Sequence, residues 1–224
     1  MDMVNPSPQT EGHVFVNPIR PDSYMGMLCY KNGSLVRQRL RDEHELDWEQ
    51  FGRVLESTPP TSQLYIRFDF EEITPVLEGS WQFAVNNDGK VEPVEIEKEH
   101  EIRALIETQI IAKRAHAIKF GFGQGEKVIV TGGASSNQEI LGVIADVFQL
   151  DVYVNESTAN SAAMGAAYRA FYSSKEQSQP YDEVIGNKVK LSLAAKFNPD
   201  LAEHYQKMVN AYVVAEKQLL NKSI

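Results

Sequence analysis

The sequence predicts an α/β domain, and two observations carry this prediction. First, residues 127–172 alternate β-branched segments with helical apolar spacing, in the order strand, glycine turn, helix, strand, helix. Second, the segments 99–120 and 199–221 each have one apolar face, which predicts helices that can cover a sheet. Strands that alternate with helices are typical of parallel sheets with right-handed crossovers.

The N-terminal part is expected to begin as a linker and continue as β structure. Residues 1–12 are polar and turn-forming, and we interpret them as a linker remnant. Apolar bursts predict strands within 13–19 and 23–30. The Asn-Gly pair before residues 34–41 favours a tight turn, so the segment SLVRQRLR is expected to complete a β-hairpin.

Residues 47–98 are expected to form one helix and then less regular structure. Asp47 is a suitable N-cap for a helix over 47–55, and the pair Pro59-Pro60 forces a break after it. Residues 61–98 alternate apolar and polar side chains only in part, and they predict an insertion of irregular β structure.

The C-terminal segments predict a parallel pair of strands, 127–131 and 151–154, and two further helices. The helix over 161–172 and the residues just before it carry small side chains that favour close packing on the sheet, namely Ala159, Ala162, Ala163, Gly165 and Ala166. Residues 173–199 are typical of a loop. The stripe on the last helix is expected to dock on the chain's own body, with a seam for a partner as the alternative; it consists of Tyr205, Met208, Tyr212, Ala215 and Leu219.

The composition argues against several classes of partner. The net charge of −9 would repel the phosphate backbone, so we expect no nucleic-acid partner. The single cysteine, Cys29, allows no intramolecular disulfide and indicates a reducing compartment. Neither a signal-peptide pattern nor a run of about 18 apolar residues occurs, so we expect a cytoplasmic protein without membrane contact.

The Gly132-Gly133 turn is the candidate binding site. It follows a β-branched strand and precedes a helix, which places it at the carboxyl end of a sheet, where open α/β sheets bind ligands. Because glycine has no Cβ, a flat ring or a phosphate can approach the main chain there, and the helix N-terminus adds free amides. The spacing matches neither the dinucleotide pattern nor the P-loop, so a Rossmann domain is disfavoured and the pair alone can be structural punctuation.

The residues around this turn show a family resemblance. The segment VTGGASSNQEILGVIADVFQLDVYV, followed by SAAMGAAYRAF, resembles the adenosine motif of the FGGY family of carbohydrate kinases. The segments HVFVNPIRPDSYMGMLCYKNGSLVRQRLRDEH and DFEEITP are similar to the opening of the same domain in the eukaryotic xylulokinases of that family. The resemblance covers residues 12–172, and it assigns residues 13–224 to a C-terminal FGGY kinase domain.

The resemblance implies a ribonuclease-H-like fold of the actin and hexokinase superfamily, with a mixed sheet flanked by helices. It also implies ATP with Mg²⁺, and phosphorylation of D-xylulose to D-xylulose 5-phosphate. In the family the Gly-Gly turn packs on adenine and ribose, which implies contacts from Gly132 and Gly133, with Ala134 lining the same wall. Asn137 stands where a family Asn contacts the adenine edge; capping the next helix is its alternative role, and one side chain could serve both.

Other polar residues near the turn are expected to be structural. Ser135 and Ser136 are favoured as loop or cap residues, and Asp146 as a solvated or structural charge. A ribose or cleft contact from Asn155-Glu156, after the second strand, is the less favoured alternative.

The family's reactive groups are expected in another domain. The resemblance implies that the amino-terminal half carries the catalytic Asp, the first phosphate loop and most sugar contacts, and that a Gly-Thr-rich turn forms the second phosphate loop. No Gly-Thr-Ser or Gly-Thr-Thr sequence occurs in this chain, so we assign it no catalytic residue and no metal ligand. Alone it is expected to be inactive, to bind ATP or ADP weakly and to self-associate through an exposed domain interface. A kinase for another sugar or polyol, and a non-catalytic adenosine-binding or interaction module, remain alternatives.

Overall fold

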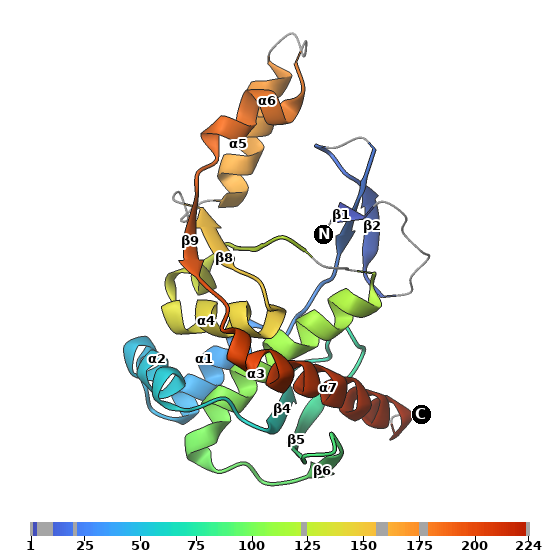
Figure 1. The fold of residues 1–224 in the computed structure, drawn as a ribbon, viewed down its shortest axis with the longest axis vertical. Helices are drawn as coiled ribbons and strands as arrows, with labels where there is room; N and C mark the ends of the chain where they lie inside the picture. The colour runs from blue at the N-terminus through green and yellow to red at the C-terminus, as the bar shows by residue number, and fades with distance from the viewer. Residues whose placement is uncertain are drawn as a thin grey trace.

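The computed structural model describes residues 2–3, 11–19, 22–121, 125–155, 161–174 and 179–222. Figure 1 shows the order of the elements along the chain. The N-terminal half contains β1 (Asp2–Met3), β2 (His13–Val16), β3 (Tyr24–Met27), α1 (Ser34–Glu43), α2 (Trp48–Ser57), β4 (Gln63–Phe68), β5 (Gly79–Val85), β6 (Val91–Pro93) and α3 (Lys98–Lys119). The C-terminal half contains β7 (Val128–Val130), η1 (Gly133–Ser136), α4 (Gln138–Phe148), β8 (Val152–Asn155), α5 (Ser161–Ser173), α6 (Tyr181–Ile185), η3 (Gly186–Lys188), β9 (Leu191–Ala195), η4 (Pro199–Leu201) and α7 (Ala202–Lys222).

The long helix α3 forms the centre of the hydrophobic core. It contacts β4, α4 and α7, and Ile102, Leu105 and Ile111 on it are completely buried. The stripe expected on the last helix is buried as a whole against this core, which confirms that α7 docks on the chain's own body; its members are Tyr205, Met208, Tyr212, Ala215 and Leu219. Among the described residues, no helix is both long enough and apolar enough to cross a membrane.

A buried polar cluster joins α3 to α7 and to the segment before β4. The Arg103 guanidinium and the Glu107 carboxylate pair at 2.6 Å, and Glu107 is completely buried. The Tyr205 hydroxyl donates to Glu107 Oε1 at 2.7 Å, and the Thr61 amide donates to Glu107 Oε2 at 3.1 Å. Burial, together with the Glu107 charge, raises the pKa of Tyr205. The cluster therefore stays satisfied although water does not reach it.

The strands form three small sheets, with the orders β1-β3-β2, β4-β5-β6 and β7-β8-β9. In the third sheet β7 and β8 are parallel, as predicted, with Val128 opposite Val152. Strand β9 adds to β8 in the antiparallel direction, which makes this sheet mixed. The prediction of a loop over 173–199 is therefore wrong, because this stretch contains α6, η3 and β9.

Two further segments differ from the sequence-based expectation. Residues 61–98, expected to be an insertion of irregular β structure, do contain β structure, but it is the regular antiparallel sheet β4-β5-β6 at the base of the domain (Figure 1). The strand predicted over 34–41 is wrong, since the segment forms α1 and buries Val36 and Leu40, one helical turn apart on one face. The Asn32 side chain does not serve a hairpin; it bonds to the main chain of Phe70 instead, through Nδ2 at 2.8 Å and Oδ1 at 3.1 Å.

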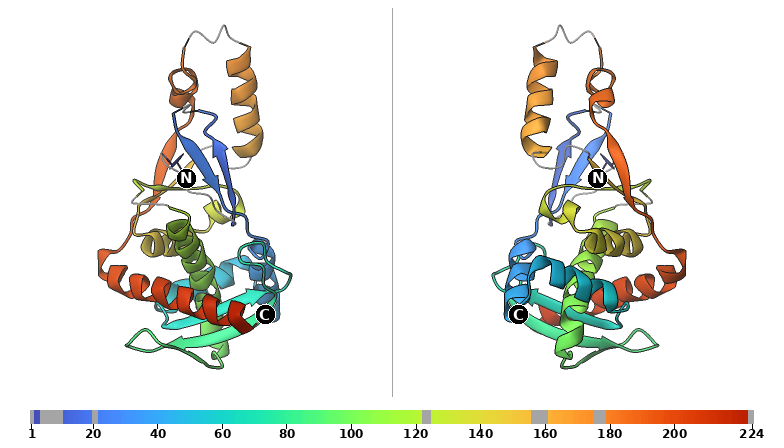
Figure 2. Two further views of the ribbon diagram at one scale, coloured as in Figure 1. Left: turned by 90° about the vertical axis from the view of Figure 1, so that its right-hand side faces the viewer. Right: turned by 90° about the vertical axis from the view of Figure 1, so that its left-hand side faces the viewer.

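Helix α5 stands away from the core together with α6 (Figures 1 and 2). It buries none of its residues, so the prediction that its small side chains pack closely on the sheet is wrong for Ala162, Ala163, Gly165 and Ala166. Ala159 lies outside the described residues. The helix contacts α6 instead, where the rings of Tyr172 and Tyr181 lie 5.1 Å apart. Alanine side chains offer little apolar area, so leaving them exposed costs little free energy.

Two predicted helices agree closely with the structure. Helix α2 begins after Asp47, whose side chain accepts from the Gln50 amide at 2.7 Å, while the Gln50 side chain accepts from the Asp47 amide at 2.9 Å. This capping box fixes the start of α2. Helix α3 spans Lys98–Lys119, against the predicted 99–120.

Candidate functional site

The candidate site is the turn between β7 and α4, residues 132–137. Gly132 has φ +79° and ψ −165°, a backbone conformation that is essentially restricted to glycine. Gly132 and Gly133 are both exposed, and a Cβ added to either would have no protein atom within 4 Å among the described residues. Among the described residues, no side chain therefore covers the main chain at these two glycines.

The hydroxyls of the turn bond to its own main chain. Ser135 Oγ donates to the Gly132 carbonyl at 2.7 Å, and Ser136 Oγ donates to the Gly133 carbonyl at 2.8 Å. The Ser135 amide also donates to the Gly132 carbonyl, at 3.0 Å. Both serines thus have the loop role expected of them, and they hold the turn in one shape. Ala134 is partly buried against the hydrophobic core, and this contact attaches the turn to the core.

Asn137 caps helix α4. Its Oδ1 accepts a hydrogen bond from the Ile140 amide at 2.8 Å, in the manner of an N-cap residue. Among the described residues, no hydrogen bond is formed by its Nδ2. The alternative role considered from sequence is therefore present, and both N–H donors of Nδ2 are unpaired among the described residues.

Helix α4 holds the turn rigidly. It buries Leu141, Ala145 and Val147 almost completely, so its capped N-terminus has a fixed position. Asp146 is structural, as predicted, because its Oδ1 accepts from the Asn198 amide at 2.7 Å. Burial raises the pKa of Asp146. Asn155 is the last residue of β8, opposite Leu191 of β9, and Glu156 lies outside the described residues.

Sequence reasoning missed one neighbour of the turn, helix α2. At the position where a Cβ on Gly52 would lie, Glu139 Oε2 is 3.3 Å away and Asn137 Nδ2 is 3.6 Å away. The main chain of α2 therefore lies directly against the start of α4. A glycine in the middle of an otherwise regular helix was the signal that could have indicated this contact.

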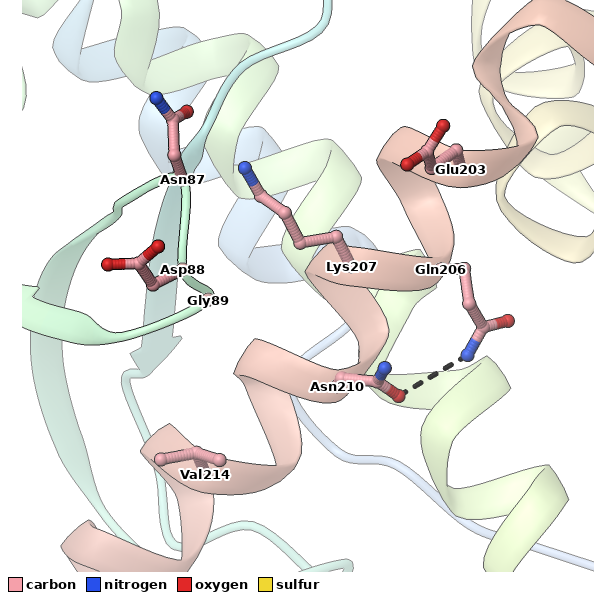
Figure 3. A pocket seen from close by; sticks show the side chains of 8 residues that line it. All are labelled: Asn87, Asp88, Gly89, Glu203, Gln206, Lys207, Asn210 and Val214. Carbon is pink, nitrogen blue, oxygen red and sulfur yellow. Dashed lines mark hydrogen bonds between the residues drawn. The ribbon is translucent and has the colours of Figure 1, made fainter.

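A second hollow, of about 480 Å³, lies between the β5–β6 turn and the exposed face of α7 (Figure 3). Its lining includes the polar side chains of Asp88, Lys207 and Asn210, together with Val214. The start of α7 accepts a hydrogen bond from Gln149, which follows the last residue of α4, whereas the glycine turn precedes the first residue of α4. The hollow shares none of its lining residues with the turn. Small-molecule sites are mostly enclosed, and this hollow is open to solvent, so we assign it no role.

The fold agrees with the comparison to known proteins. Residues 1–174 match the model of the FGGY family of carbohydrate kinases, C-terminal domain. The chain therefore belongs to the FGGY family of carbohydrate kinases.

Among its relatives is the xylulose kinase of Mus musculus, which is 40% identical over 222 residues, covering 96% of this chain and 40% of that protein. The structure of a xylulose kinase from Rhodospirillum rubrum aligns with a TM-score of 0.76 at 17% identity, over 98% of this chain and 44% of that chain. A glycerol kinase from Plasmodium falciparum, solved with ADP, aligns with a TM-score of 0.65 at 13% identity, over 92% of this chain and 40% of that chain. The chain thus has the actin and hexokinase-like fold that the resemblance implies, and it spans about 40% of the length of these relatives.

Proposed function

We propose that this chain is the nucleotide-binding half of a cytoplasmic xylulose kinase, which transfers the γ-phosphoryl group of ATP to D-xylulose and yields D-xylulose 5-phosphate. The observation that carries the proposal is the open main chain at Gly132-Gly133, at the end of a parallel strand and directly before a capped helix. The name of the mouse relative supports the choice of sugar, and the ADP with which the glycerol kinase was solved supports the choice of nucleotide.

In this proposal the adenosine part of ATP packs on the turn. A flat purine can approach Gly132 and Gly133 because no side chain covers their main chain, and Ala134 continues the same wall. Asn137 Nδ2 then donates to a ring nitrogen at the adenine edge, while Oδ1 keeps its bond to the Ile140 amide. One side chain would thereby fix both the helix start and the base.

The turn does not fit a metal held by protein side chains. Residues 132–137 contain no carboxylate, and the hydroxyls of Ser135 and Ser136 already bond to the turn's own carbonyls. Mg²⁺ prefers carboxylate and phosphate oxygens. We therefore propose that Mg²⁺ reaches the enzyme on the phosphates of ATP, and that the residues of this turn bind only the adenosine part.

We further propose that the catalytic base and most sugar contacts belong to a second domain that covers strand β2. Every residue of β2 is exposed, and Val14 and Val16, which lie on the same face of the strand, are 37% and 68% exposed. Apolar side chains exposed side by side on a strand favour a covering partner. Without that domain, the 224 residues are expected to be inactive and to self-associate in a concentration-dependent way.

Calorimetric titration with ATP and with ADP tests the nucleotide site. We expect weak binding by the wild-type chain and at least a roughly tenfold loss with Gly133→Val, because the new side chain would stand where the purine packs. Gly133 has no positive φ and open space around it, so the variant should fold normally. Equal affinity of the two proteins would refute the placement of adenine on this turn.

The activity is tested by mixing the chain with a separately expressed amino-terminal half of a relative and assaying a panel of sugars and polyols for ADP release. We expect phosphorylation of D-xylulose by the mixture and none by the chain alone. Preference for another sugar would favour the alternative kinase, and nucleotide binding without turnover in any mixture would favour the non-catalytic module. Turnover by the chain alone would contradict the assignment of the base to another domain.

A further inference from the structure

Gly52 occupies an unusual place, in the middle of helix α2 and buried. Glycine inside a helix is less favourable than alanine by about 1 kcal/mol, so a structural reason for it is expected. The reason is visible on the side that faces α4. A Cβ at this position would lie 3.3 Å from the Glu139 carboxylate and 3.6 Å from the Asn137 amide nitrogen. The first distance is tighter than most contacts of a Cβ and the second is an ordinary van der Waals contact, so the absence of a side chain lets α2 lie close against the start of α4.

Helix α2 cannot easily move away from this contact. Phe51 and Leu55, on either side of Gly52, are completely buried in the core. The capping box of Asp47 and Gln50 fixes the N-terminal end of the helix. A side chain at position 52 would therefore press on the Glu139 carboxylate, in the first turn of α4, rather than shift α2.

The start of α4 is where Asn137 has its cap bond. Asn137 Oδ1 is held by the Ile140 amide, and this bond sets the plane of the side-chain amide and the direction of Nδ2. We infer that Gly52 is a positioning residue: its missing side chain lets α2 rest against Asn137 and Glu139, and so fixes the capped helix start and the turn before it in the geometry that receives adenine. The inference rests on the proposed function for the adenine contact, but its effect on the cap does not depend on a nucleotide.

The test compares Gly52→Ala with a matched control, Gly142→Ala. Gly142 also lies inside a helix, in α4, and a Cβ there would have nothing within 4 Å, so both changes bring the same gain in helix propensity. For Gly52→Ala we expect ADP affinity to fall by about three- to tenfold, the range of coupling between contacting residues, while the melting temperature is unchanged or higher. The control should bind ADP as the wild type does.

Hydrogen exchange of the Ile140 amide supplies a readout without nucleotide. This amide donates to Asn137 Oδ1, so its exchange should become several-fold faster in Gly52→Ala and stay unchanged in Gly142→Ala. The double variant Gly52→Ala, Glu139→Ala removes the carboxylate at 3.3 Å, and it should recover part of the protection. The same double variant keeps the test open if Gly52→Ala alone does not fold.

The outcomes separate the two ideas. If the wild type binds no nucleotide but Ile140 exchange responds as described, the proposed function fails and the positioning role of Gly52 stands. If Gly52→Ala leaves both the ADP affinity and the Ile140 exchange at wild-type values, the inference is overturned. Loss of affinity in step with a lower melting temperature, equally in both variants, would also overturn it, because that pattern reports general destabilisation.

Discussion

The backbone of Gly132 allows a sharp prediction about stability. At φ +79° and ψ −165° the residue lies in a region that is nearly closed to residues with a Cβ, and the strain is of order 1–3 kcal/mol. Gly132→Ala should therefore lower the free energy of unfolding by about that amount, reduced by about 0.4–1 kcal/mol because alanine also restricts the unfolded chain. Space is not the cause, since an added Cβ would meet no atom within 4 Å.

The matched variant is Gly133→Ala, one residue further along the same turn. Gly133 also has open space around it but has no positive φ, so its replacement should raise the free energy of unfolding by about 0.4–1 kcal/mol, through the same effect on the unfolded chain. In a domain of this length 1 kcal/mol shifts the melting temperature by about 2–4 °C, so Gly132→Ala should melt several degrees below Gly133→Ala.

Thermal unfolding followed by circular dichroism, without nucleotide, measures both variants. If Gly132→Ala and Gly133→Ala melt at the same temperature, the backbone conformation at position 132 does not require glycine. Our description of the turn as preformed would then be refuted. Because no ligand is present, this result is independent of the proposed function.

Two further predictions concern the core. Arg103→Met would leave Glu107 buried with only its bonds to Tyr205 and Thr61. Breaking a buried pair in this way should lower the free energy of unfolding, measured with urea, by about 3–5 kcal/mol. A decrease below about 1 kcal/mol would contradict the role of the pair. Burial lowers the pKa of Lys113 to about 8, so between about pH 8 and pH 10 the unfolded chain binds more protons and stability should rise with pH. Lys113→Met should lose this rise, which thermal melts at both ends of the window check; an equal pH response in the variant would show that other groups cause it.

The strand, turn and helix around the candidate site could be predicted because their signals are local. The β-branched run before Gly132-Gly133 and the apolar spacing of α4 each lie within about one element length, and Asn137 is a favoured cap residue. The apolar stripe of α7 could be predicted for the same reason, since Tyr205, Met208 and Tyr212 repeat at helical spacing.

The predictions that are wrong concern segments whose secondary structure depends on tertiary contacts. The Asn-Gly pair before residues 34–41 favours a hairpin, but burial of Val36 and Leu40 on one face selects a helix. Strand β9 forms because Leu193 pairs with Tyr153, which is far away in the sequence, and no local sequence pattern predicts that pairing. The contact of Gly52 with Asn137 joins residues on different helices, so the sequence could show an unusual glycine but not what lies against it.

The position of α7 affects how the protein can mature on the ribosome. Tyr205 and Tyr212 are among the largest completely buried side chains, and they cover a core that is otherwise built from residues 36–147. During synthesis the apolar side of α3 therefore stays exposed until the residues of α7 have left the ribosomal exit tunnel. A nascent chain halted before α7 would present this surface to chaperones.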